Sequence, residues 1–166
     1  MLTNRQVNIF IFFFLIFLFS SQAFSQSSEK YIKSINLDGN DNLSLSDILF
    51  LVRQRPSDFF FKRSKFNPRL LKLDALTLKS YYHSKGFLDV TVEESFFDEN
   101  NNIDIYYKIN EGKRYYLSKV DILGNKLITD SKIKTLLGLK INQPYNPVYI
   151  NDNLYRLENE YHQIGK

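Results

Sequence analysis

The sequence predicts an α+β fold in which one unit of helices and strands is used twice. A segment with a helical apolar stripe, an Asn-Pro start and a glycine stop occurs at two places in the 166 residues. After the first of these segments the apolar spacing changes from 3.6 to 2, which is typical of a helix followed by strands. Glycine-asparagine turns precede the helices in both halves. Recurrence of the whole pattern indicates a protein built from repeats.

The repeated segment is expected to be an amphipathic helix. Its first copy runs from Asn67 to Gly86 and its second from Asn146 to Gly165. Asn before Pro suits an N-cap followed by the first helical position, and glycine suits a left-handed C-terminal cap. Apolar residues at i, i+4, i+7 and i+11 share one helix face. The matched positions are Leu71, Ala75, Leu78 and Tyr82 in the first copy and Ile150, Leu154, Leu157 and Tyr161 in the second.

The first 25 residues are typical of a secretory signal peptide. Arg5 precedes an apolar run over residues 7–19, and Ala23-x-Ser25 suits the −3/−1 requirement of signal peptidase. The alternative is an uncleaved membrane anchor. The run of about 13 residues is shorter than the roughly 20 that span a bilayer, which favours cleavage.

Cleavage would leave a polar lead-in, residues 26–30, and would lower the net charge from +4 to +3 because only Arg5 among the charged residues is lost. The chain has no cysteine, which excludes a lipidated N-terminal Cys, a disulfide framework and thiolate metal sites. An exported chain without cysteine fits a bacterial envelope.

The first unit is expected to span residues 31–112 and to open with a strand over residues 31–37, then a turn at 38–42. A short helix follows and ends before Pro56. The helix 67–86 comes after a basic, aromatic insertion. The short helix has Ser44 or Ser46 as its N-cap and Ile48, Leu51 and Val52 on its apolar side.

A hairpin completes the first unit. Residues 88–97 alternate in polarity, residues 98–102 form a polar loop, and residues 103–109 alternate again as the return strand. The unit is therefore strand, helix, helix, strand, strand. One face of its three-stranded sheet should be buried against the two helices, because a two-layer domain has one core.

The second unit, residues 113–166, repeats this order from a strand at 116–122 onward. Thr129 is the expected N-cap of its short helix, in which Ile133, Leu136 and Leu137 match the apolar side of the first short helix. The chain stops before the hairpin strands would return. We therefore expect the sequence to be the N-terminal fragment of a longer protein.

In this order the motifs resemble POTRA (polypeptide-transport-associated) repeats, as found in BamA-like outer-membrane assembly and translocation factors. The resemblance covers residues 31–166 and rests on the order and repetition of short motifs. They are Ile35-x-Leu37-x-Gly39-Asn40, Tyr82-x-x-x-Gly86-Phe87, Ile109-Asn110-Glu111-Gly112 and Val120-x-Ile122-x-Gly124-Asn125. It implies β-α-α-β-β units, each a three-stranded sheet on two antiparallel helices, with the second unit incomplete.

The resemblance also implies a function. It indicates the periplasmic region of an outer-membrane β-barrel protein assembly factor in a Gram-negative bacterium, attached to the outer membrane through a barrel that this chain does not contain. The expected partners are unfolded outer-membrane proteins and assembly lipoproteins. The alternatives are the arm of a two-partner-secretion or translocation transporter, and a POTRA scaffold anchored in the inner membrane.

No residue pattern indicates catalysis, a cofactor or a metal. His83 and His162 occupy equivalent positions near helix ends, which favours a structural role. The polar turns starting at Asp38 and Asp98 lack the glycine and the bidentate glutamate of a calcium loop. An exported chain of small net charge is not expected to bind nucleic acid. We therefore expect a non-enzymatic protein.

Two surfaces are candidates for binding. The first is the edge of the strand that follows the helix 67–86, where backbone groups could pair with an extended peptide. The alternative is an edge that the acidic residues Asp89, Glu93 and Glu94 protect from pairing. The candidate edge residues are Asp89, Thr91, Val92 and Glu93.

The second surface is the basic, aromatic insertion, which could contact an anionic membrane surface or a partner protein. The alternative is a solvated charged face, which is what most charge runs are. The candidate residues of this patch are Phe59, Phe60, Phe61, Lys62, Arg63 and Lys65.

Overall fold

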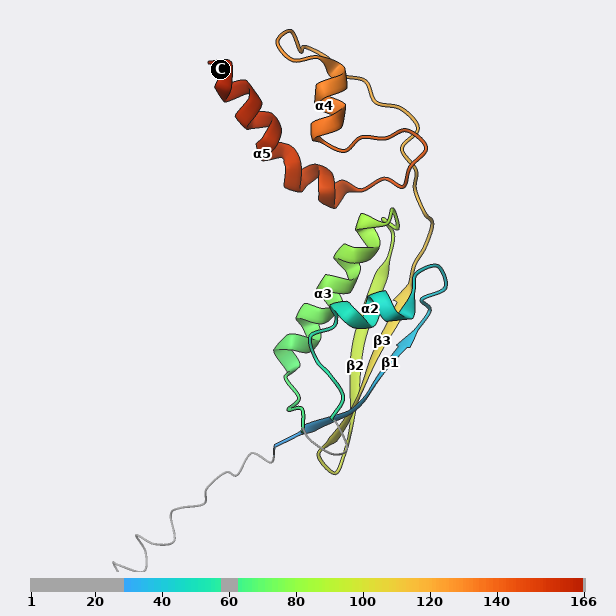
Figure 1. Cartoon of the computed structure of the whole chain (residues 1–166). Helices are drawn as coiled ribbons and strands as arrows, with labels where there is room; N and C mark the ends of the chain where they lie inside the picture. Colours follow the sequence, from blue (N-terminus) through green and yellow to red (C-terminus); the bar gives the residue numbers. More distant parts are fainter. Residues whose placement is uncertain (1–28, 58–62, 166) are drawn as a thin grey trace, which may run out of the picture.

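The computed structural model describes residues 29–57 and 63–165, and the rest of the chain is left out of the description below. Figure 1 shows two groups of elements joined by a linker, with the second group beyond the C-terminal end of α3. The elements are β1 (Tyr31–Asp38), α2 (Leu45–Leu51), α3 (Pro68–Ser84), β2 (Thr91–Glu99), β3 (Asn102–Asn110), α4 (Asp130–Leu136) and α5 (Pro147–Gln163).

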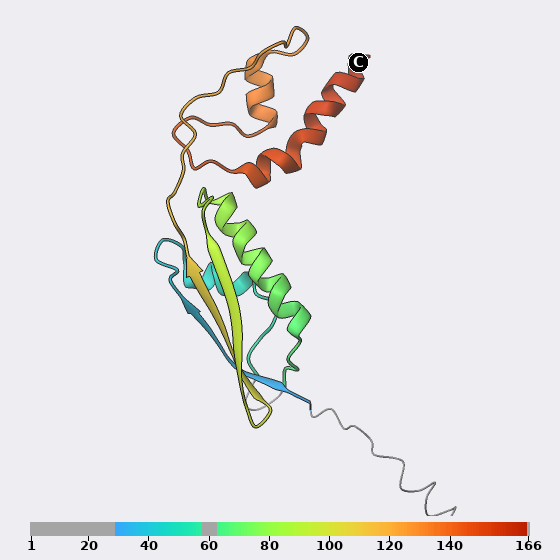
Figure 2. The ribbon, with the colours of Figure 1, turned by 180° about the vertical axis from the view of Figure 1, so that it is seen from behind.

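The first repeat is a mixed three-stranded sheet in the order β1-β3-β2. β3 is the central strand, parallel to β1 and antiparallel to β2. Asn100 and Asn101 form the tight turn of the β2–β3 hairpin, with φ of 52° and 68°, as a two-residue turn of this kind requires. Helices α2 and α3 both cover the same face of the sheet, as Figures 1 and 2 show. The predicted α+β class is confirmed.

The core of this repeat lies between α3 and the sheet. The predicted stripe of α3 is buried, and it packs with alternate residues of the central strand. The Asn67 side chain accepts hydrogen bonds from the backbone N–H groups of Arg69 (2.9 Å) and Leu70 (3.4 Å), as expected of an N-cap. The buried apolar residues of β3 are Ile103, Ile105, Tyr107 and Ile109.

Asp74 is a polar member of this core that the apolar pattern did not predict. It is fully buried, and its carboxylate accepts hydrogen bonds from the backbone N–H groups of Arg53 (2.9 Å) and Gln54 (3.2 Å). The Tyr107 hydroxyl also donates to it at 3.5 Å. Burial and this neighbouring carboxylate raise the pKa of Tyr107. Asp74 therefore supplies acceptors for the chain that leaves α2, which ends in extended backbone at Val52.

Two of the sequence motifs meet beside the C-terminal ends of β1 and β3. Gly39 has φ +83°, and a Cβ there would lie 2.0 Å from the carbonyl oxygen of Ile109. The Glu111 carboxylate accepts hydrogen bonds from the backbone N–H (3.1 Å) and the side-chain amide (2.5 Å) of Asn42. The turn that contains Gly39 and Asn42 and the Ile-x-Glu-Gly motif are therefore in direct contact in the folded unit.

The predicted boundaries of the hairpin strands need correction. The strand expected from residue 88 begins at Thr91 and continues to Glu99, so the hairpin loop is shorter than predicted. The preceding residues are held in a turn instead, because the Phe87 N–H donates to the Tyr82 carbonyl at 3.1 Å and Phe87 forms an isolated bridge with Arg114.

The prediction of a strand at 116–122 in the second repeat is wrong. Tyr116 forms only an isolated bridge with Pro144, and the rest of the segment is irregular. β1 is a strand because it pairs with β3, whereas no strand follows α5 in the described part of the chain. A strand without a hydrogen-bonding neighbour is not stable in water.

The two helices of the second repeat consequently enclose a small core of Ile128, Ile133 and Leu137. Thr129 caps α4 as predicted by accepting a hydrogen bond from the Lys132 N–H (3.3 Å). The apolar stripe of α5 is only partly covered, and Leu154 is 43% exposed. The helices form from local signals, and no strand in the described part of the chain covers their apolar faces.

Candidate peptide-binding edge and repeat junction

The sheet of the first repeat has two edges, and they differ. At the outer edge of β1, the Ile32 N–H donates to the Ser64 carbonyl (2.8 Å), and the Ile32 carbonyl accepts from the Ser57 N–H (2.8 Å). The Phe66 N–H donates to the Lys30 carbonyl at 2.9 Å. Residues within the insertion and on both sides of it therefore cover the start of β1.

The edge formed by β2 is open among the residues that the structure describes. β2 pairs with β3 along its whole length, from Thr91 opposite Asn110 to Glu99 opposite Asn102, and with no other described strand. In an antiparallel pair, alternate residues turn their N–H and C=O groups away from the partner strand. These groups of β2 are available to an added strand.

The four candidate edge residues do not all lie on this edge. Thr91 and Glu93 are exposed on β2, while Val92 is half-buried against the core. Val92 could therefore offer only its backbone to a bound peptide. Asp89 precedes β2, and its carboxylate accepts a hydrogen bond from the Tyr115 hydroxyl at 2.7 Å. That hydrogen bond raises the pKa of Tyr115. It also holds the Asp89 side chain against the linker and away from the edge of β2.

Two aromatic residues at the far end of β2 add apolar surface to the edge. Phe96 is 44% and Phe97 60% exposed, and the two lie on opposite faces of the strand. The Phe96 ring lies 4.7 Å from that of Phe66, centroid to centroid. The sequence predicted Phe96 and Phe97 as the end of the strand and did not single them out as a site. Their exposure on an edge strand is the missed signal.

Of the basic, aromatic patch, Phe59, Phe60, Phe61 and Lys62 lie outside the described residues. The Arg63 guanidinium lies 5.2 Å from the centroid of the Tyr31 ring. The Lys65 ammonium forms an ion pair with Glu29 and is partly neutralised by it. These two cations therefore lie at the start of β1, and Lys65 lines a small pocket together with Phe96 of β2.

The linker between the repeats is bonded to both of them. On the side of the first repeat, the Tyr115 N–H donates to the Gly86 carbonyl at 2.8 Å. On the side of the second, the Tyr115 carbonyl accepts from the Tyr145 N–H at 3.0 Å. Gly86 has φ +92°, and a Cβ there would lie 2.7 Å from the Tyr115 carbonyl oxygen. The glycine that ends α3 therefore also lets the linker approach.

Arg114 reinforces the same junction. Its Nε donates to the Lys85 carbonyl at 2.9 Å, and its guanidinium lies 5.3 Å from the Phe87 ring centroid and 5.8 Å from that of Tyr116. A planar cation between two rings is held by cation–π attraction. Arg114 is thereby fixed between the end of α3 and the linker.

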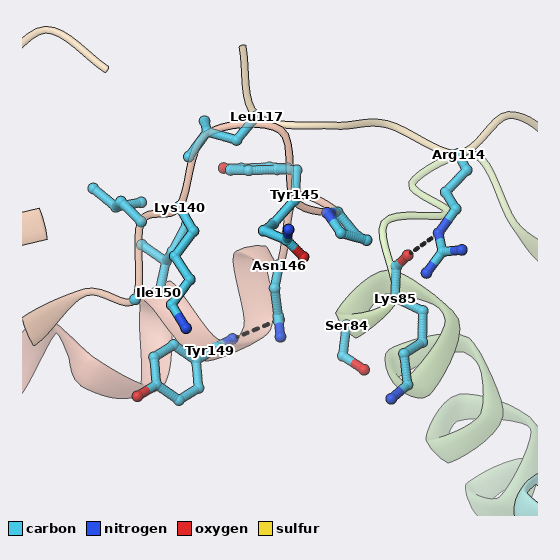
Figure 3. A pocket seen from close by; sticks show the side chains of 13 residues that line it. Ser84, Lys85, Arg114, Leu117, Lys140, Tyr145, Asn146, Tyr149 and Ile150 are labelled. Carbon is cyan, nitrogen blue, oxygen red and sulfur yellow. Dashed lines mark hydrogen bonds between the residues drawn. The ribbon is translucent and has the colours of Figure 1, made fainter. Parts of the chain in front are cut away.

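A pocket of about 540 Å³ opens at this junction. Figure 3 shows that the end of α3 forms one side and the loop before α5 with the start of α5 forms the other, with Arg114 beside them. The residues of the pocket with charged or polar side chains are Ser84, Lys85, Arg114, Lys140, Gln143, Tyr145, Asn146 and Tyr149.

Within residues 29–57 and 63–165, no group of three or more His, Cys, Asp or Glu side chains is placed to hold a metal ion. The searched helices of the described chain include none that is both long and apolar enough for a membrane span. His83 and His162 lie in the last turns of α3 and α5, at equivalent places in the two repeats.

Comparison with known proteins gives relatives of one kind. The chain is 26% identical over 131 residues to the outer membrane protein assembly factor BamA of Nitratidesulfovibrio vulgaris, covering 76% of this chain and 17% of that protein. It is 29% identical over 118 residues to BamA of Neorickettsia risticii, covering 70% and 15%. The chain thus spans less than a fifth of the length of these curated relatives.

A crystal structure of POTRA domains 3–5 of Haemophilus influenzae BamA has a similar fold, with a TM-score of 0.56 at 16% sequence identity over 79% of this chain and 50% of that one. The model of the POTRA family, described as a surface antigen variable number repeat, matches residues 30–112 and again residues 115–166. These matches take in most of the chain and follow its two repeats. The chain belongs to the POTRA family.

Proposed function

We propose that this chain is part of an outer-membrane protein assembly factor, and that it binds unfolded outer-membrane proteins by adding their strands to the edge of β2. The names of the BamA relatives support the first half of this proposal. The second half rests on a single observation. β2 is an open edge in the described chain, whereas the start of β1 is covered by hydrogen bonds to residues 57, 64 and 66.

Strand addition suits a protein that must bind many unfolded chains. Backbone N–H and C=O groups are the same in every sequence, so pairing at the edge does not select one substrate. The exposed Phe96 and Phe97 would add apolar contact at one end of the bound strand. Binding of this kind needs no catalytic group, and we propose a non-enzymatic role.

The same proposal implies a cellular location for the chain. A region that meets unfolded barrel proteins before insertion would lie in the periplasm, next to the outer membrane. Assembly lipoproteins are proposed as further partners. The first 25 residues, which lie outside the described residues, would then be the export signal, and the mature chain would begin at Gln26.

Disulfide trapping tests the edge, because the chain has no cysteine of its own. Glu93→Cys places one thiol on the exposed side of β2 without touching the core. The probe is a synthetic peptide of about 10 residues, the length of a barrel strand, with alternating apolar and polar residues and one cysteine. We expect a mixed disulfide to form under mild oxidation, at a rate that rises with peptide concentration and reaches a plateau.

The matched control is Lys79→Cys, on the exposed side of α3. It should react slowly and without a plateau, because an exposed helix face offers no backbone groups to an added strand. Equal trapping at residues 79 and 93 would contradict strand addition at β2. It would leave the assignment to the POTRA family untouched.

A further inference from the structure

Among the described residues, the charged side chains that line the junction pocket are all positive. Its lining includes Lys85 from the end of α3, Arg114 from the linker and Lys140 from the loop before α5, and it includes no aspartate or glutamate. An adjoining pocket of about 400 Å³ shares Lys140 and adds Lys134, again without an acidic residue. Four cations from the end of α3, the linker, α4 and the loop before α5 therefore border two adjoining pockets.

None of these cations has a carboxylate partner among the described residues, and the Lys85 ammonium lies 5.0 Å from the centroid of the Tyr81 ring. Other described lysines do form ion pairs, such as Lys119 with Asp121 at 2.8 Å and Lys30 with Asp98 at 2.6 Å. None of the ion pairs between described residues includes Lys85, Arg114, Lys134 or Lys140. An anion bound in the pocket would supply the counter-charge that these side chains lack.

The geometry of Arg114 also suits an anion. Its Nε is engaged with the Lys85 carbonyl and its plane lies between two rings, so the orientation of the guanidinium is fixed. Its two terminal nitrogens donate no hydrogen bond among the described residues. A pre-oriented guanidinium with free N–H groups is well adapted to a phosphate oxygen.

We propose that the junction pocket binds a phosphate group, with Lys85, Arg114 and Lys140 as its cationic contacts. Three positive charges match a phosphate better than a single carboxylate, and the side-chain amides of Gln143 and Asn146 supply further N–H donors. The lining comes from both repeats, so the bound group would hold them in the arrangement seen in Figure 3. The source is either a free phosphate compound or the headgroup of an anionic lipid.

Titration of the full chain with inorganic phosphate at constant ionic strength, followed by amide NMR, tests the proposal. We expect saturable shifts at Lys85, Arg114 and Lys140. The double variant Lys85→Gln/Lys140→Gln removes two cations and leaves the contacts of Arg114 in place. It should weaken binding about tenfold or more, because two of the three cationic contacts are lost.

The matched control is Lys79→Gln/Lys126→Gln, which removes one exposed cation from each repeat outside the pocket. Its phosphate affinity should equal that of the unchanged chain. A second arm measures binding to phosphatidylcholine vesicles with and without phosphatidylglycerol. Pocket-dependent binding to phosphate alone identifies a soluble ligand, and pocket-dependent binding to the anionic vesicles identifies a headgroup. Equal loss in both double variants, or no saturable binding in either arm, would overturn the proposal.

Discussion

The two repeats carry the same helix signals, yet among the described residues the long helix of the first is buried more completely than that of the second. Leu78 in α3 is fully buried. Leu157, its counterpart 79 residues later in α5, is only half-buried. Both helices have an Asn N-cap whose side chain accepts backbone N–H groups and a proline in the first turn. The difference shows that local signals are enough to form the helices, whereas their burial requires the sheet.

The same contrast appears at equivalent polar and glycine positions. Asp74 accepts two backbone hydrogen bonds from the chain that leaves α2, while its counterpart Asn153 donates within its own helix, to the Tyr149 carbonyl at 2.6 Å. A Cβ on Gly39 would lie 2.0 Å from the backbone of β3. A Cβ on Gly124, its counterpart, would contact nothing within 4 Å. Shared motifs therefore gain a tertiary role only where the sheet is present.

The largest expected effect is on the free energy of unfolding, when the equivalent leucines of α3 and α5 are each replaced by alanine. Leu78→Ala should lower the free energy of unfolding of the first repeat by about 2–5 kcal/mol, because it leaves a cavity in a closed core. Leu157→Ala should cost less than about 1.5 kcal/mol, because much of its surface is already in water. Urea denaturation followed by circular dichroism, with amide hydrogen exchange of β3 for the first repeat and of α5 for the second, measures both. Equal losses would mean that α5 is buried as completely as α3.

The next effect separates the cost of positive φ from the cost of a steric clash with neighbouring backbone, at two equivalent glycines. Gly39→Ala and Gly124→Ala both place a side chain at positive φ, which costs about 1–2 kcal/mol. Only Gly39→Ala should cost more than this, because its Cβ would meet the Ile109 carbonyl and force β1 away from β3. Denaturation of the two variants gives the comparison directly. A Gly39→Ala loss no greater than that of Gly124→Ala would contradict the contact.

The smallest effect concerns the linker that joins the repeats. The hydrogen bond to the Asp89 carboxylate raises the pKa of Tyr115, so it stabilises the fold with Tyr115 protonated. That contribution is fully present below the unfolded-state pKa of tyrosine, about 10, and is lost as the pH rises through the folded pKa. NMR titration of labelled tyrosines should show Asp89→Asn lowering the Tyr115 pKa. Asp121→Asn, which removes an exposed carboxylate from the segment 116–122, should leave the titration unchanged.

Much of the first repeat could be predicted because its signals are local. The Asn-Pro start of α3, its apolar stripe and the alternation of the hairpin strands each depend on neighbours within one element. The strand expected at 116–122 failed for the opposite reason. Its residues have strand-like alternation, but a strand also needs a partner, and β1 has one only because β3 lies beside it.

The sequence by itself determined the repeat, its helices and its family, since caps, stripes and turns are short-range features. Only the tertiary structure decided which sheet edge is free, because the cover on β1 comes from Ser57, Ser64 and Phe66, more than 20 residues along the chain. It likewise brought Lys85, Arg114 and Lys140 to one pocket from separate segments. Contacts between residues far apart in sequence leave no periodic pattern, so the fold alone assembles these surfaces.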